Sequence, residues 1–487
     1  MQRLDCHVKE YAWGKRGVTS EVARLFAAGH KKFRIGPKTP YAELWMGTHP
    51  DGPARVQDTS ERLSSLIARS DSSSYLLNNN GNSADVDEVH LAFIMKIMSI
   101  NHTLSLQVHP TKEQAARLHK SDPLNYPDRN HKPELAYALT RFELLCGFRP
   151  AVEILENMKA FPELTELMGF EKQQEFERLV QSGVPQESTK MRKALRGCFK
   201  KMMYASPDVI AKQLASLKAR IASGVRGCLI EDTIKVMEQT WTLFPNDVGC
   251  FASLYLNHMI LQPGECCFYE AEELHAYLSG ECVECVGCSN NTIRAGLTPK
   301  FVDRENLIDV LNYRMTDPSF YMVPRTSLNG YDCVSEYAPN CKDFTLHQVD
   351  LPSQRAPRAV VAELPVLNCA SIIVIVSGNV ECQELIAEIE PSGRQSEWGL
   401  ANLREGKRGD IFYIPPQSQI RLIKRGDEDV LAYRTFSYEI GPDHGSRIKL
   451  PTNDVATKIA MPIRTFDHMH NGVADYIDKT IEMDGFI

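Results

Sequence analysis

The run NHTLSLQVHP at residues 101–110 decides the fold around it, because polar and apolar residues alternate there as they do along a half-buried strand. Leu104, Leu106 and Val108 share one face of this predicted strand with His102. Thr103, Ser105, Gln107 and His109 share the other. One face is therefore predicted to join a core and the other to form a polar surface or a site.

Gln107 and His109 lie two residues apart on the polar face, which separates them by about 7 Å along a strand. They are either polar residues facing solvent or two ligands of a metal whose third ligand comes from elsewhere in the chain. Glu134, in the run NHKPE at residues 130–134, is the candidate for that third ligand. His275 is, by itself, equally a ligand or a buried histidine.

The segments on either side of this run have clear patterns. Thr111 and Gln114 follow it with the spacing of a capping box, so a helix is expected after the strand. Residues 93–100, FIMKIMSI, read as a buried strand that carries one charge, Lys96. A buried ammonium is costly without a partner, so Lys96 either faces a pocket or extends its charge to solvent.

Composition limits the classes of function. The chain has 487 residues, 43% hydrophobic and 24% charged, which is typical of a globular protein of two to three domains. A net charge of −7 argues against a nucleic-acid partner, although a small anion could still bind a local cluster of Lys and Arg. The first ten residues lack the apolar core of a signal peptide, and no run reaches the length of a membrane span. Fourteen scattered Cys without a disulfide framework indicate a cytoplasmic protein with free thiols.

The periodicity changes twice along the chain. Between residue 150 and about residue 241 it becomes helical, as in Val209, Ile210, Leu214, Leu217 and Ile221, with a helix start at 206–208. A strand pattern returns at 251–261 and again at 371–378 and 408–415. Residues 70–85 are rich in Ser and Asn and are predicted to be a mobile loop, and His468 and His470 are assigned to a solvated tail.

Six short motifs then occur in a fixed order. They are YAWGK at 11–15, ELWMGTHP at 43–50, SLQVHP at 105–110, NHKPE at 130–134, HAYLSG at 275–280 and RAGLTPK at 294–300. Together they resemble type I mannose-6-phosphate isomerase, also called phosphomannose isomerase. The resemblance covers residues 11–300 and weakens after about residue 320.

The resemblance implies a mainly β fold of the cupin superfamily with an antiparallel jelly-roll barrel as its catalytic domain. That domain would comprise residues 1–149 and 245–320, with a helical insertion domain at 150–244 and a structural, cupin-like β domain plus tail at 321–487. It further implies one zinc ion per chain, a monomer, and the interconversion of mannose 6-phosphate and fructose 6-phosphate, which supplies GDP-mannose and glycan synthesis.

Residue roles follow from the same motifs. The implied metal ligands are Gln107, His109, Glu134 and His275, and the implied catalytic residues are Arg294, His131, Lys132 and Glu284. The implied substrate contacts are Ser105, Lys96, Lys300 and Trp13. For two of them an ordinary structural role is an equally good interpretation, since Ser105 can be a strand serine and Lys300 a surface lysine. Any of His131, Lys132 and Glu284 could move the proton, and the sequence does not choose among them.

Two features complicate this interpretation. The family usually has Asp-Asn before the Arg-Ala-Gly motif, whereas this chain has Asn290-Asn291, so a zinc- and sugar-phosphate-binding protein with impaired or lost turnover is the alternative function. Cys282, Cys285 and Cys288 have part of the spacing of an iron-sulfur motif. No further Cys completes it, and on a strand the first two would face opposite ways, which argues against a cluster.

Overall fold

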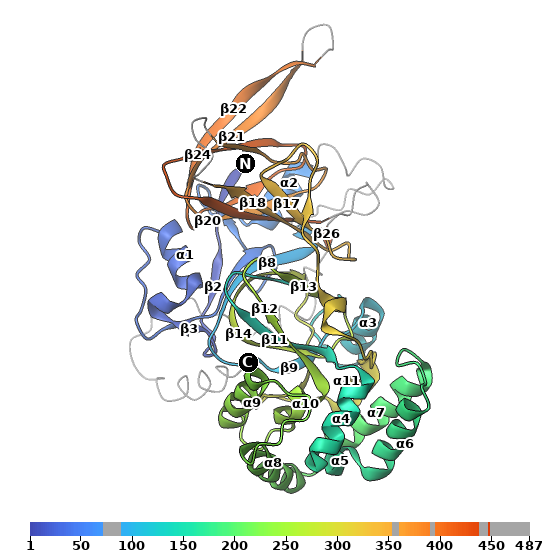
Figure 1. The fold of residues 1–487 in the computed structure, drawn as a ribbon. Coiled ribbons are helices and arrows are strands. Elements are labelled where there is room, and N and C mark those ends of the chain that lie inside the picture. Colours follow the sequence, from blue (N-terminus) through green and yellow to red (C-terminus); the bar gives the residue numbers. More distant parts are fainter. Residues whose placement is uncertain (72–88, 353–359, 390–394, 438–446, 449–487) are drawn as a thin grey trace, which may run out of the picture.

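The computed structural model describes residues 1–71, 89–352, 360–389, 395–437 and 447–448. The Ser- and Asn-rich segment from residue 72 onward and the tail with His468 and His470 lie outside the described residues. The chain is mainly antiparallel β-sheet, with helices α4 to α10 (residues 151–255) gathered at the end of the molecule opposite the C-terminal strands (Figure 1).

The sheet that carries the site is built around the long strand β14. Its main path runs in the order β12 (Leu256–Leu261), β11 (Phe142–Phe148), β14 (His275–Gly287), β8 (Phe93–Ile100), β5 (Glu43–Gly47) and β2 (His7–Lys9). Strands β10 (Glu134–Ala138), β13 (Cys266–Tyr269), β9 (Leu106–Val108) and β15 (Ile293–Gly296) pair beside this path. The predicted strand at 93–100 is confirmed and fully buried, whereas the strand predicted over 101–110 is limited to the three residues of β9.

β14 pairs with different neighbours along its length. Its first part pairs with β9 and β11, and from Gly280 onward it pairs with β8. Gly280 has φ +110, and a Cβ atom there would lie 2.5 Å from the carbonyl oxygen of Arg141. Glycine therefore allows the close approach at the point where the strand changes partners. One strand thus carries both His275 and Glu284 into the same part of the sheet.

The helical insertion contains α4 (Ala151–Ala160), α5 (Pro162–Met168), α6 (Phe170–Gln181), α7 (Thr189–Met203), α8 (Pro207–Ala222) and α9 (Glu231–Leu243). α8 begins at the predicted Pro, and Ile210, Leu214, Leu217 and Ile221 are buried. Val209, the first residue of the predicted periodic set, lies in the helix but is 41% exposed. Its neighbour Ile210 fills the core position, and adjacent helical residues point in different directions.

The return of strand structure was predicted five residues too early. Residues Val248–Phe251 form the short helix η3 and Ala252–Tyr255 form α10, so β12 begins only at Leu256. The Asp247 side chain accepts a hydrogen bond from the backbone N–H of Gly249 and starts this helical stretch. The apolar residues 251–255 then pack into the core of the helical insertion, which an apolar run alone does not reveal.

A second β region follows the sheet built around β14. We call that first sheet the catalytic sheet, because several of the site residues expected from the sequence lie on its strands. One sheet has the order β16 (Thr326–Ser327), β17 (Val334–Tyr337), β18 (Thr345–Leu351), β25 (Val430–Phe436), β20 (Ser371–Ser377), β23 (Ile411–Ile414), β1 (Gln2–Asp5) and β6 (Arg55–Val56). The other has the order β19 (Val361–Glu363), β24 (Gln419–Arg425), β21 (Asn379–Ile389) and β22 (Gln395–Lys407). Gln2 is paired with Tyr413, so the start of the chain completes a sheet made mostly from its C-terminal part.

The remaining elements are short strands and helices. They are β3 (Lys15–Arg16), η1 (Gly17–Thr19), α1 (Glu21–Gly29), β4 (Pro40–Tyr41), α2 (Leu63–Asp71), β7 (His90–Leu91), α3 (Lys112–Ser121), α11 (Arg304–Val310), η4 (Pro318–Tyr321) and β26 (Arg447–Ile448). The predicted capping box of α3 is present, with both Thr111 and Gln114 bonded to backbone N–H groups. Within the described ranges, no helix has the length and apolarity that crossing a membrane requires.

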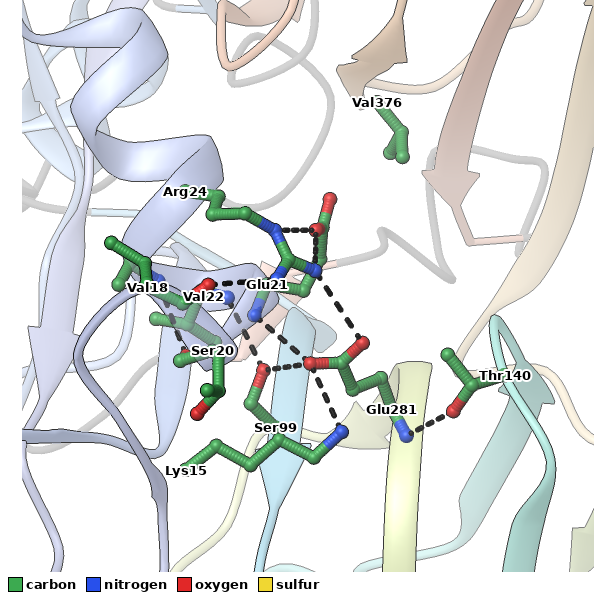
Figure 2. Close-up of polar contacts among 12 residues, drawn as sticks. Lys15, Val18, Ser20, Glu21, Val22, Arg24, Ser99, Thr140, Glu281 and Val376 are labelled. Atoms are coloured by element: carbon green, nitrogen blue, oxygen red, sulfur yellow. Dashed lines mark hydrogen bonds and ion pairs between the residues drawn. The ribbon is translucent and has the colours of Figure 1, made fainter.

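Helix α1 is tied to β14 through a buried carboxylate. Glu281 is 4% exposed, and its Oε1 accepts hydrogen bonds from the backbone N–H of Glu21 at 2.9 Å and from the Ser99 hydroxyl at 3.1 Å. Lys15 Nζ lies 3.3 Å from the same oxygen (Figure 2). Glu21 also pairs with Arg408, from the turn before β23. This network connects the N-terminal helix, the catalytic sheet and the C-terminal sheets.

Candidate active site

A cavity of about 340 Å³ opens into the catalytic sheet. Nine residues proposed from the sequence line it: Trp13, Lys96, Ser105, Gln107, Lys132, Glu134, His275, Glu284 and Arg294. His109 lies directly behind this wall and is 1% exposed. The folded chain therefore brings together most of the residues that the motifs had nominated from distant positions.

Three strands place their side chains at the same point of the cavity. Gln107 on β9 is paired with His275 on β14 and with Arg294 on β15. Residues paired across neighbouring antiparallel strands have Cβ atoms about 5 Å apart. The register thus explains why these residues, separated by up to 187 positions (294 − 107), share one wall.

His109, Glu134 and His275 form a buried group of potential metal ligands. Their ligand atoms all lie within 4.8 Å of one another. His109 Nε2 is 3.1 Å from Glu134 Oε1, and His275 Nε2 is 3.5 Å from Glu134 Oε2. Two imidazoles and a carboxylate at this spacing are a donor set that zinc accepts.

The hydrogen bonds of both histidines favour this interpretation. His109 Nδ1 donates to the carbonyl oxygen of Asn291 at 2.7 Å, and His275 Nδ1 donates to that of Glu273 at 2.9 Å. Each Nε2 is then an unprotonated lone pair that faces Glu134, and His109 Nε2 is buried without a hydrogen-bond partner. A lone pair opposite a carboxylate is repulsive unless a cation lies between them, so the residues present fit a metal ion.

The protonation states agree with metal binding. Burial lowers the pKa of His275 to about 4 and also lowers the pKa of His109, so both rings are neutral at neutral pH. Burial alone would raise the pKa of Glu134, but the neighbouring Lys132 ammonium holds it well below its usual value. Neutral imidazoles and an ionised carboxylate are the forms that bind metals.

Gln107 lies at the edge of this group. Its Nε2 is 3.5 Å from His275 Nε2, and its Oε1 accepts a hydrogen bond from the Ser105 hydroxyl at 3.0 Å. Rotating the amide by half a turn would direct the oxygen toward His275. Gln107 is therefore placed where it can supply a fourth donor.

A second set of buried charges surrounds Lys96. Its Nζ is 2.9 Å from Glu284 Oε2 and 3.7 Å from Glu43 Oε1, because β8 lies between β14 and β5 with Lys96 paired to Glu284 and to Trp45. Burial would lower the pKa of Lys96, but Glu284 and Glu43 outweigh it and raise that pKa. The prediction that a buried Lys96 faces a pocket and a partner is confirmed.

Two residues proposed from the sequence lie elsewhere. His131 does not line the cavity, and its Nε2 is 2.9 Å from both carboxylate oxygens of Asp343, in the second β region. Lys300 does not line it either, and its backbone N–H donates to the Thr298 hydroxyl. Both follow turns whose direction the sequence motif does not reveal.

The thiols of the Cys282, Cys285 and Cys288 motif lie in separate apolar clusters. Burial raises the pKa of each, and Cys285 exchanges a hydrogen bond with Thr435. The alternation of a strand separates the first two, as the sequence analysis expected. These thiols are core side chains.

Sequence reasoning missed several residues that also line the cavity. They are Lys9, Tyr11, Glu43, Asp51, Met98, Leu104, Tyr277 and Thr292, whereas Asn290 and Trp45, which also line it, lie in segments that the sequence had already indicated. Tyr277 follows His275 by two on the same strand, so period-two alternation could have found it. Glu43 and Asp51 depend on the pairing of β5 with β8, for which the sequence has no local signal.

The inserted helices, the antiparallel sheets and a cavity that combines acids, bases and a His-Glu-His group define a mainly β protein with a helical insertion and a candidate metal site. Residues 1–151 match the family model described as phosphomannose isomerase type I, catalytic domain, and residues 167–256 match the helical insertion domain of the same family. The chain belongs to the type I phosphomannose isomerase family, as the six motifs predicted, and it is an isomerase.

Relatives and solved structures agree with this assignment. The chain is 40% identical over 438 residues to mannose-6-phosphate isomerase of Homo sapiens, covering 88% of this chain and 97% of the relative. It is 33% identical over 444 residues to the enzyme of the same name from Candida glabrata, covering 89% and 98%. The crystal structure of mannose 6-phosphate isomerase in its apo form from Salmonella typhimurium has a TM-score of 0.67 at 23% identity and covers 90% of this chain and 99% of that one. This last likeness supports the fold.

Proposed function

We propose that the chain interconverts D-mannose 6-phosphate and D-fructose 6-phosphate with one zinc ion held by Gln107, His109, Glu134 and His275. The observation that carries this proposal is the buried His109-Glu134-His275 group, whose two imidazole lone pairs face one carboxylate. The cavity beside it is also lined by the guanidinium of Arg294. The names of the relatives indicate the substrate.

The reaction moves a proton between C1 and C2 of an open-chain sugar and stabilises negative charge on the oxygen of one of these carbons. A bound zinc ion supplies Lewis-acid stabilisation of that charge. The protein contributes the orientation of the sugar, a group that holds the proton, and exclusion of water from the reacting carbons.

Arg294 is proposed to oppose negative charge on the substrate. It lines the cavity, its Nε is buried without a hydrogen-bond partner, and no carboxylate within ion-pair distance is found among the described residues. Burial lowers its pKa, which is the cost of keeping this guanidinium unpaired before an anion binds. Ser105 and Trp13 line the same cavity and remain proposed substrate contacts, whereas Lys300 would need another conformation to reach it.

Proton transfer is assigned to the two candidates that face the cavity. Lys132 Nζ is 3.0 Å from Glu134 Oε1, next to the proposed metal. Burial raises the pKa of Glu284 and Lys96 opposes that rise, so this carboxylate can accept a proton closer to neutral pH than an exposed one. His131 is directed to Asp343 and is the weaker candidate.

The cellular role follows from the reaction. The product mannose 6-phosphate would supply GDP-mannose and glycan synthesis, and the enzyme would act as a cytoplasmic monomer. Every cysteine lies in the described ranges and all are free thiols, as expected in a reducing compartment.

The test is a coupled assay with mannose 6-phosphate before and after chelation, with zinc then added back. We expect turnover to disappear with the chelator and return with zinc, and to fall by about a hundredfold or more in Gln107→Ala and Arg294→Ala. The exposed residues Gln262 and Arg178 provide matched controls as Gln262→Ala and Arg178→Ala, which should be unchanged. Wild-type protein that binds zinc and the sugar phosphate without turnover would instead support the binding protein that Asn290 suggests.

A further inference from the structure

Asp51 and Asn290 meet on one wall of the cavity. Asp51 follows β5 and Asn290 follows β14, and both line the cavity. The Asn290 amide nitrogen donates a hydrogen bond to Asp51 Oδ2. The residue at which this chain departs from the family pattern is therefore in direct contact with a carboxylate.

The backbone of Asn290 is fixed by its own loop. Its backbone N–H donates to Asp128 Oδ2 at 2.8 Å, and Asp128 also accepts from Ser289 and Asn291. The loop of residues 289–291 is thus anchored on one buried carboxylate. The backbone of Asn290 is therefore fixed beside Asp51, and its amide contacts the Asp51 carboxylate.

Asp51 is likewise held through its backbone. Its N–H donates to His49 Nδ1 at 3.1 Å, and its carbonyl oxygen accepts a hydrogen bond from Lys9 Nζ at 2.6 Å. Lys9 also lies 4.7 Å above the ring of Trp45. These contacts orient the loop through the backbone of Asp51. Its carboxylate accepts the hydrogen bond from Asn290.

A carboxylate offers about four acceptor positions, and the amide of Asn290 occupies one of them. The others are available to donors in the cavity. The hydroxyl groups of a sugar are such donors, whereas the phosphate of the same molecule would be repelled. The wall formed by Asp51 therefore suits the hydroxylated part of a sugar phosphate.

We propose that Asp51 is a substrate-binding residue that accepts hydrogen bonds from sugar hydroxyls, and that Asn290 is its positioning residue. The negative charge that the family pattern places at residue 290 is kept in the cavity, one hydrogen bond away. This inference rests on the proposed function, and it assigns Asn290 to an active enzyme rather than to an impaired one.

The test is a swap of the two side chains, with kcat and KM for mannose 6-phosphate and zinc content measured for each variant. Asp51→Asn should raise KM by about tenfold to a hundredfold, because a hydrogen bond to a charged group is lost, and it should keep its zinc. The double variant Asp51→Asn with Asn290→Asp restores one carboxylate and one amide, and its KM should return to within about threefold of wild type. Asn290→Ala keeps the Asp51 carboxylate but removes the amide that positions it, so it should raise KM less than Asp51→Asn does.

Asp58→Asn is the matched control, since Asp58 is exposed seven residues further along, and its kinetics should be unchanged. An unchanged KM in Asp51→Asn, or a double variant no better than Asp51→Asn alone, would overturn the inference. Asp51→Asn could fail to fold, which lost zinc and a lowered melting temperature would show. The KM values of Asn290→Ala and of the double variant are then compared to test the inference. Wild-type protein without turnover rejects the proposed function itself, which separates the two failures.

Discussion

The catalytic sheet and the C-terminal sheet each bury a histidine beside a glutamate, yet among the residues that the structure describes only the first pair belongs to a group of potential metal ligands. His109 Nε2 is 3.1 Å from Glu134 in the catalytic sheet, and His347 Nε2 is 3.2 Å from Glu336 in the C-terminal sheet. The first pair is joined by His275 and borders a cavity. A buried His-Glu pair is therefore a structural element until a third donor and an opening converge on it.

The surroundings of the two pairs differ in the same way. The core beside the C-terminal sheet is apolar, with Ile373, Phe412, Ile414 and Val430 among its buried members. The catalytic sheet instead buries the charges of Lys96, Glu284 and Glu134. Buried charges are costly even when they are paired, so this group of three marks where the catalytic sheet gives up stability for chemistry, whereas the C-terminal sheet buries the cation Arg434 against neutral acceptors.

The largest expected effect separates the two glutamates. Glu134→Gln removes the charged ligand between the two imidazoles, so we expect loss of bound zinc and a fall in turnover of at least about a thousandfold. Glu336→Gln should keep its zinc and retain turnover within about twofold. Metal analysis and the coupled assay check both, and a zinc-loaded, active Glu134→Gln protein would break the comparison.

The buried cations should differ in their effect on stability. Lys96→Met leaves Glu284 and Glu43 without their cation and should lower the free energy of unfolding by about 3–5 kcal/mol. Arg434→Met in the C-terminal sheet removes hydrogen bonds to the neutral acceptors Ser371 Oγ and Pro365 O, and should cost about 1–3 kcal/mol.

Urea unfolding of each variant at neutral pH measures this difference. The double variant Lys96→Met with Glu284→Gln serves as a control. It also removes one of the carboxylates left without a cation, so it should recover part of the lost free energy of unfolding. Equal losses in Lys96→Met and Arg434→Met would contradict the view that the two sheets treat charge differently.

His347 should make the C-terminal sheet sensitive to acid. Burial lowers its pKa in the folded protein despite its bond to Glu336. The unfolded chain therefore takes up a proton that the folded chain refuses, so the contribution of His347 to stability is present above its unfolded pKa of about 6.5 and is lost as pH falls. Urea unfolding of His347→Gln between pH 7 and pH 5 should show a shallower loss of stability than wild type, and parallel curves would exclude this role.

The smallest effect is expected on the surface of the C-terminal sheets. Arg425 forms an exposed ion pair with Glu381, and such pairs contribute at most about 1 kcal/mol. Arg425→Ala should lower the free energy of unfolding by less than that amount and leave kcat and KM unchanged. A change in KM would show that the C-terminal sheets influence the cavity.

Sequence periodicity and capping residues predicted those helices and strands whose boundaries depend on nearby residues. The buried strand at 93–100, the capping box at Thr111 and the helix starting at Pro207 follow from periodicity and capping. The grouping of His109, Glu134 and His275 came from family motifs, because spacing alone left His275 equally a ligand or a buried histidine.

Features that depend on distant pairing were not predictable. The contact of Lys96 with Glu43 requires the register of β5 on β8, and the turn of His131 toward Asp343 requires the second β region to be in place. Helix α1 was not among the predicted elements; the Ser20 side chain caps it by accepting from the backbone N–H of Ala23.

The pairing of β1 with β23 also sets an order of events during synthesis. Arg3 is paired with Phe412, so some 400 residues separate the two partners. A ribosome adds about 5–20 residues per second, so β1 waits for its neighbour for tens of seconds. During that time β1 presents an unpaired edge, and the helical insertion, whose contacts are local, can fold before it. β1 is therefore synthesised long before its pairing with β23 can be completed.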